Sequence, residues 1–180
     1  MKKSILLAAI LLVGCDGKEE QTPQLTTPLV IEFKFETGIT YREVECLAKN
    51  IYFEARGERM QGQVAVAHVA INRKTDKRFP NTICEVVYQG EISNWFLTEQ
   101  NRIVPLINRC QFSWWCDGKS DEPKDMWAWE RAMGVAAGVI NDIYKDPTEG
   151  ALWYHNLDVD PDWNQQLAST GQIENHLFYR

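Results

Sequence analysis

The chain has 180 residues, of which 44% are hydrophobic and 24% charged, and this length and composition suit one globular domain with short appendages. Its formal net charge is −6, and subtracting the two positive charges of Lys2 and Lys3 leaves −8. Because a body this acidic lacks the basic surface that nucleic-acid backbones require, we exclude nucleic acid as a partner.

The N-terminus has the pattern of an export signal. An apolar run over residues 5–13 follows Lys2 and Lys3, and it is much shorter than the ~20 residues of a membrane-spanning helix. The run ends in Leu-Val-Gly-Cys15, which resembles the lipobox of bacterial lipoproteins, where the cysteine carries the lipid. We therefore predict an exported lipoprotein that faces the periplasm or cell envelope. The alternative is a plain signal peptide with an incidental cysteine.

The domain organisation follows from this leader. Residues 1–14 are predicted to be the signal peptide, and residues 15–37 the lipidated Cys15 and a polar tether. Residues 38–180 are predicted to be the folded domain, which we expect to be a monomer.

The remaining four cysteines predict disulfides, since they are even in number and the chain is expected to enter an oxidising compartment. A zinc site would need paired CxxC or HxxxH spacing, which the chain lacks, so we expect no metal and no cofactor. Four cysteines allow three pairings, and the sequence does not choose among them. We favour Cys46–Cys84 with Cys110–Cys116.

The first predicted helix starts at Thr40, which forms a capping-box pattern with Glu43. Apolar residues then recur at the spacing of one helical face, and Gly57 is a natural stop. Glu54 falls on the flank of this apolar stripe, in the last turn of the helix.

Further helices complete a compact, mainly α-helical domain with long loops and little or no sheet. A helix over about 60–73 has almost no polar face and is predicted to be buried. Thr82 and Glu85 predict a short helix through Tyr88, and residues 89–122 are predicted to be irregular. Pro123 is expected to open a long amphipathic helix. Its predicted inward side is Trp129, Met133, Ala136, Val139, Ile140 and Ile143, and the chain from residue 150 onward is predicted to be loop-like.

Glu54 is the sharpest catalytic candidate. The negative end of the helix dipole and the apolar neighbours both disfavour its carboxylate, so both raise its pKa. A general acid that works near neutral pH requires such a raised pKa. The alternative is a surface ion pair with Arg56 or Arg59, and spacing alone does not decide between these interpretations.

The chain resembles the cell wall hydrolase family that includes the spore cortex-lytic enzymes. The central motif is Phe-Glu-Ala-Arg-Gly-Glu over residues 53–58. The resemblance covers nearly everything from Cys46 onward, through the stretches 46–58, 62–69 with Asn72-Arg73, 79–84, 110–114, 116–118, 146–148 with 150–151, 153–156 and 176–179.

The resemblance implies a lysozyme-like catalytic domain that acts on peptidoglycan glycan strands as a lytic transglycosylase, with the glutamate that matches Glu54 as catalyst. One carboxyl group then protonates the bond between N-acetylmuramic acid and N-acetylglucosamine and afterwards deprotonates the sugar's own 6-hydroxyl. A second catalytic carboxylate is therefore not required, unlike in paired-acid glycosidases. If one were needed, Glu58 or Asp117 would be the candidates, although an ion pair with a neighbouring arginine and a turn are the alternative interpretations for these two residues.

Several other residues in the matched motifs are predicted to contact substrate, each with a structural alternative. Gln111 and Ser113 could bind the sugar's N-acetyl group or only their own loop backbone. Among the aromatic residues Trp114, Trp115, Trp153, Tyr154 and Trp163, only some are expected to line a groove, because most aromatics in a domain are core. We select Trp114 and Tyr154, together with Glu58 and His155.

The three histidines are interpreted separately. His155 could line the site or hold the C-terminal loops in place, whereas His68 and His176 are predicted to be structural.

Three functions compete with the transglycosylase: a muramidase that uses water, an N-acetylmuramoyl-L-alanine amidase, and a non-catalytic wall-binding lipoprotein. Such amidases commonly use zinc, and these histidines lack a ligand spacing.

Overall fold

The computed structural model describes residues 39–180. The predicted signal peptide, the lipidated Cys15 and the tether lie outside the described residues. Within residues 39–180, none of the helices is both long enough and apolar enough to cross a membrane.

Helix α1 (Tyr41–Ala55) begins with the predicted capping box. The Thr40 hydroxyl accepts from the Glu43 backbone N–H, and the Glu43 carboxylate accepts from the Thr40 backbone N–H. The prediction is confirmed. The buried face of α1 is the predicted apolar stripe, so the helix packs its last turn, with Glu54, against the rest of the domain.

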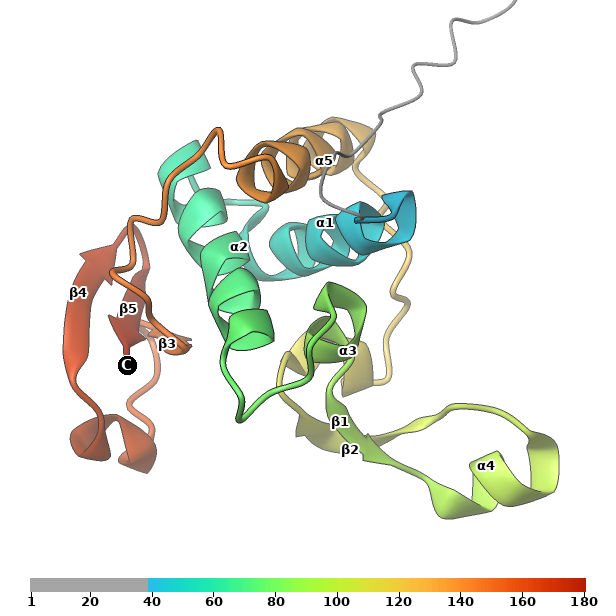
Figure 1. Cartoon of the computed structure of the whole chain (residues 1–180). Coiled ribbons are helices and arrows are strands. Elements are labelled where there is room, and N and C mark those ends of the chain that lie inside the picture. The colour runs from blue at the N-terminus through green and yellow to red at the C-terminus, as the bar shows by residue number, and fades with distance from the viewer. Residues whose placement is uncertain (1–38) are drawn as a thin grey trace, which may run out of the picture. The chain divides into compact units, whose positions relative to one another are not determined.

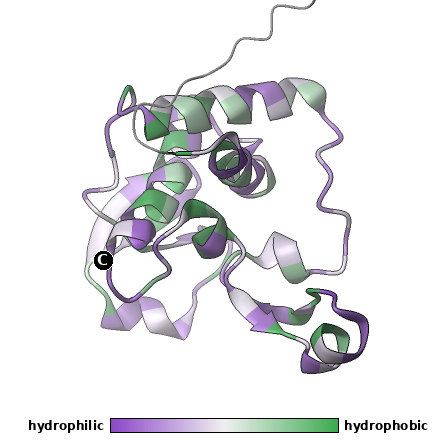
Figure 2. Cartoon of the chain, turned by 45° about the vertical axis from the view of Figure 1, so that its right-hand side comes forward, coloured by the Kyte–Doolittle hydropathy of each residue, from purple (hydrophilic) through white to green (hydrophobic). Residues whose placement is uncertain are grey.

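Helix α2 (Met60–Thr75) is buried along nearly its whole length, as its apolar sequence predicted. Helix α3 (Ile83–Val87) starts at Thr82, whose hydroxyl accepts from the Glu85 backbone N–H. These two helices pack against α1 and against each other. Figure 2 shows hydrophobic residues concentrated along the helices.

Helix α5 (Met126–Ile140) packs across both α1 and α2 and closes the main core. Two details of its prediction are wrong. Pro123 lies before the helix, and Asp125 caps it by accepting from the Ala128 N–H. Ile143 lies beyond the helix end and is 69% exposed, because the helix stops at Ile140 and periodicity no longer applies.

The segment 89–122 is more regular than predicted. Strands β1 (Gly90–Ile92) and β2 (Pro105–Cys110) pair antiparallel, and a short helix α4 (Asn94–Gln100) lies between them. A 3-10 turn η1 (Ser113–Cys116) follows. These strands are mostly exposed, so they lack the apolar alternation by which a half-buried strand is recognised.

The C-terminal segment is not loop-like but forms a three-stranded antiparallel sheet (Figure 1). Its strands β3 (Trp153–Asn156), β4 (Ser169–Ile173) and β5 (His176–Tyr179) have the order β3-β5-β4, and η2 (Asp162–Gln166) lies between β3 and β4. Phe178 of β5 packs with Ala65 and Val69 of α2, which joins sheet and helices. Even with these small sheets the domain is mainly helical, as predicted.

Both favoured disulfides are confirmed. Cys46–Cys84 joins α1 to α3, and Cys110–Cys116 joins the end of β2 to η1. The first bond spans 38 positions of the chain and fixes the helix that carries Glu54 to its neighbour.

Candidate active site

Glu54 lies in the last turn of α1, with its side chain only partly exposed. Burial raises the pKa of this carboxyl above its ordinary value of 4.5. A hydrogen bond from Tyr154 and the positive charge of Arg73 act in the opposite direction and partly offset the effect. The carboxyl therefore holds its proton more tightly than a solvated glutamate, which agrees with the expectation from its apolar neighbours.

Tyr154 of β3 is the direct partner of this carboxyl. Its hydroxyl donates to Glu54 Oε2 at 3.1 Å across 100 positions of the chain. The ring packs edge-on against His176 at 5.1 Å between centroids and lies 5.7 Å from the ring of Phe178. Burial raises the pKa of Tyr154 well above 10.0, so the hydroxyl keeps its proton and acts as a donor. The structure thus brings together two of the predicted site residues.

Arg73 of α2 is the third member of this group, and it was not among the predicted site residues. Its side chain is almost completely buried, and its Nε donates to the Leu152 carbonyl at 2.7 Å. The sequence did contain a signal for it. Arg73 is a charged residue near the end of a helix that has almost no polar face, and it belongs to a matched motif.

Glu58 lies beyond the end of α1 and contacts the turn between β4 and β5. Its carboxylate accepts from Asn175 Nδ2 at 3.1 Å and lies 3.8 Å from His176 Nδ1. The alternative of an ion pair with Arg56 or Arg59 is wrong, because Glu58 pairs with neither arginine in residues 39–180. Direct contact of Glu58 with substrate stays a prediction.

In the segment after β2, the residues predicted to contact substrate differ in their exposure to solvent. Gln111 and Ser113 are exposed, and neither side chain has a hydrogen-bond partner within residues 39–180. Trp114 is only 6% exposed, and its indole N–H donates to the buried Asn50 side chain at 3.1 Å. Trp114 therefore supports the core, and little of its ring is available to a sugar. Asp117 forms the predicted turn, since its carboxylate accepts from the Lys119 N–H.

The histidines have structural contacts. His68 is buried and donates to the Tyr144 carbonyl, as predicted. The two ring nitrogens of His155 are 2.9 Å from the Asn156 carbonyl and 2.9 Å from the Tyr179 hydroxyl. Of its two predicted roles, these contacts match the one of holding the C-terminal segment in place.

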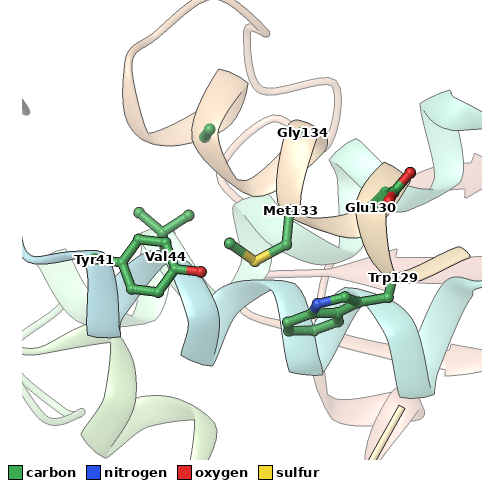
Figure 3. A pocket seen from close by; sticks show the side chains of 7 residues that line it. Tyr41, Val44, Trp129, Glu130, Met133 and Gly134 are labelled. Carbon is green, nitrogen blue, oxygen red and sulfur yellow. The ribbon is translucent and has the colours of Figure 1, made fainter. Parts of the chain in front are cut away.

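Two pockets lie away from Glu54. One, of about 290 Å³, lies between α1 and α5, where Tyr41, Val44 and Met133 point toward one another (Figure 3). The other lies beside the Cys46–Cys84 disulfide. In the described part of the chain, no three His, Cys, Asp or Glu side chains gather closely enough to hold a metal ion.

Comparison with known proteins decides the family. Residues 57–179 match the cell wall hydrolase family. The chain belongs to the cell wall hydrolase family. This confirms the resemblance found in the motifs, although the matched region begins three residues after Glu54.

Curated relatives of this cell wall hydrolase include spore cortex-lytic enzymes. The protein from Bacillus cereus is 42% identical over 142 residues, which are 78% of this chain and 45% of the relative. The protein from Bacillus subtilis is 29% identical over 142 residues, or 78% and 38% of the two chains. The chain thus spans less than half the length of these relatives.

Two solved structures resemble the fold of this cell wall hydrolase. The catalytic domain of the Bacillus cereus SleB protein is 28% identical with a TM-score of 0.54, covering 80% of this chain and 94% of that one. The catalytic domain of the germination-specific lytic transglycosylase SleB from Bacillus anthracis is 27% identical with a TM-score of 0.55, covering 81% and 100%. The similarity therefore extends over the whole of these catalytic domains or nearly so.

Proposed function

We propose that this chain is a peptidoglycan lytic transglycosylase that cleaves the bond between N-acetylmuramic acid and N-acetylglucosamine. The observation that carries the proposal is the state of the Glu54 carboxyl. Burial raises its pKa, and the Tyr154 hydroxyl holds it in place by a hydrogen bond. Membership of the cell wall hydrolase family and the similarity to the germination-specific lytic transglycosylase SleB from Bacillus anthracis support the same activity.

Glu54 acts first as the acid. Its carboxyl holds a proton more tightly than a solvated glutamate because burial raises its pKa, and it gives this proton to the glycosidic oxygen. The bond to the muramic acid ring then breaks, and positive charge develops on that ring. The Glu54 carboxylate then takes the proton of the 6-hydroxyl of the same sugar. The 6-oxygen bonds to the anomeric carbon, which closes the anhydro ring and balances the reaction without water.

Both halves of this cycle require Glu54 to change its charge within a partly buried site. The Tyr154 hydroxyl donates to the carboxylate that forms after the first proton transfer and stabilises it. Because the hydroxyl lies on a strand packed against α2, the donor is in place before the reaction begins.

The proposed setting is the cell envelope. Cys15 carries a lipid, the segment up to residue 37 is the tether, and the anchored domain reaches glycan strands as a monomer. Replacing Cys15 with alanine is expected to release the protein from the membrane fraction and to abolish incorporation of labelled fatty acid.

Digestion of purified sacculi with the full-length protein, followed by mass spectrometry of the products, tests the activity. We expect anhydro-muramic ends with the wild type and no release with Glu54→Gln. The matched control Glu130→Gln removes an exposed carboxylate on α5 and is expected to retain activity.

The other products identify the competing functions. Reducing ends would indicate a muramidase that uses water, free stem peptides an amidase, and binding without release a non-catalytic wall protein. Any of these three results, or anhydro ends formed by Glu54→Gln, contradicts the proposal.

A further inference from the structure

Arg73 is a buried cation without a carboxylate partner. Its side chain is only 4% exposed, and it forms no ion pair with any acidic group of residues 39–180. Its Nη1 has no hydrogen-bond partner in the same part of the chain. Because burial of an unpaired guanidinium removes it from water without a compensating charge, its position requires an explanation.

Aromatic rings provide part of the compensation. The guanidinium carbon lies 5.2 Å from the ring centroid of Phe79 and 5.1 Å from that of Phe112. Both distances are within the range of cation–π attraction. The ring of Phe112 is in turn 6.5 Å from that of Tyr154, so the cation and the tyrosine share a neighbour.

The end of α2 also fixes the start of strand β3. Arg73 Nε donates to the Leu152 carbonyl at 2.7 Å, two positions before Tyr154. The adjacent Asn72 donates to the Ala151 carbonyl at 3.1 Å and to the Asp146 carboxylate at 2.9 Å. The backbone that leads to Tyr154 is therefore held by side chains of α2.

We propose that Arg73 is a positioning residue of the Glu54 site, which holds the strand that carries Tyr154 and supplies the positive charge that Glu54 faces once it has lost its proton. This inference rests on the proposed role of Glu54 as acid and base. Arg73 itself makes no hydrogen bond to the Glu54 carboxyl and acts on it through Tyr154 and through its charge.

The electrostatic surroundings agree with this role. The titratable groups that act on Arg73 are Glu54 from α1 and Tyr154 from β3, and burial lowers the pKa of Arg73 to about 10. The side chain is therefore cationic at neutral pH. Its charge lowers the pKa of Glu54 against the larger effect of burial. Burial thus favours the protonated form of Glu54, and the charge of Arg73 favours its release of the proton.

The experiment compares Arg73→Met and Arg73→Gln, which remove the charge, with Arg73→Lys, which keeps the charge but lacks the Nε–H that donates to the Leu152 carbonyl. The control is Arg78→Met. Arg78 also lies over an aromatic ring, that of Trp153 at 5.1 Å, but it is solvent-exposed and already paired with Asp76. Thermal unfolding of each full-length variant identifies those that fold.

Two measurements are made on the folded variants. The first is the pH profile of kcat/KM on purified glycan strands. The second follows the carboxyl signal of Glu54 by carbon NMR as pH changes, with Glu54→Gln to assign it, and does not depend on activity.

We expect the neutral variants to move the alkaline limb of the profile and the titration of Glu54 upward by about one pH unit, and kcat to fall about tenfold. Arg73→Lys should keep the wild-type titration but lower kcat, because Tyr154 is less well held. Arg78→Met should change neither. A folded neutral variant in which Glu54 titrates as in the wild type overturns the inference. An active Glu54→Gln would instead refute the proposed function, while the titration would still report the coupling between the two charges.

Discussion

Replacing Tyr154 with phenylalanine isolates one hydrogen bond at the proposed catalytic carboxyl. The hydroxyl donates to Glu54 Oε2 at 3.1 Å, whereas the ring contacts with His176 and Phe178 do not involve it. Tyr154→Phe should therefore fold normally while the Glu54 carboxylate loses its donor.

The size of the effect follows from the charge that this bond stabilises. A hydrogen bond to a charged group contributes about 1.5–3 kcal/mol, and each ~1.4 kcal/mol is a factor of ten in rate. We therefore expect kcat of Tyr154→Phe to fall by about 10- to 100-fold. Because the lost bond had lowered the pKa of Glu54, that pKa should rise further, and the alkaline limb of the pH profile should move to higher pH.

The assay is the release of anhydro-muropeptides over a range of pH. Tyr52→Phe is the matched control, since the Tyr52 hydroxyl accepts from the backbone N–H groups of Lys124 and Asp125 rather than contacting Glu54. The control should lose stability but keep the wild-type pH profile. A wild-type kcat in Tyr154→Phe, or an alkaline limb that moves to lower pH, would refute the reasoning.

Three further substitutions test stability. Because burial raises the pKa of Glu54, the wild type should lose stability as pH rises above 4.5 through the folded-state pKa, whereas Glu54→Gln should not. Urea unfolding at a series of pH values measures this. Parallel plots of unfolding free energy against pH for the two proteins would disprove it. Replacing Cys46 and Cys84 with serine opens a loop of 38 positions and should cost about 4 kcal/mol of unfolding free energy, and an unchanged melting temperature contradicts this. Asn50→Ala leaves the buried indole N–H of Trp114 without its acceptor and should cost about 1–3 kcal/mol by the same measurement, with a loss near zero as the contrary result.

Much of the helical part was predictable because its signals are local. The capping box of Thr40 and Glu43 acts across three positions, and the apolar stripe of α1 repeats every three or four residues. The nearly continuous apolar sequence of α2 likewise indicated a buried helix. Periodicity failed at Ile143, where the pattern continues past the residue at which the helix ends.

The C-terminal sheet was missed because its stability comes from tertiary packing. Strand β5 is central, and its partners are short: β3 mixes aromatic and polar residues, and β4 is mostly polar. Phe178 is fully buried only because α2 lies against the sheet. Strand propensity estimated from the sequence does not include packing against α2, because that contact forms only in the folded protein.

The sequence by itself determined the family, the helical core and the identity of Glu54 as the candidate acid, since each depends on residues close together in the chain or on ordered motifs. Only the tertiary structure decided what surrounds that carboxyl. Tyr154 is 100 positions away, and Arg73 acts from a different helix. A pKa depends on burial and on charges in space, and the packing of α1 and α2 against β3 sets both.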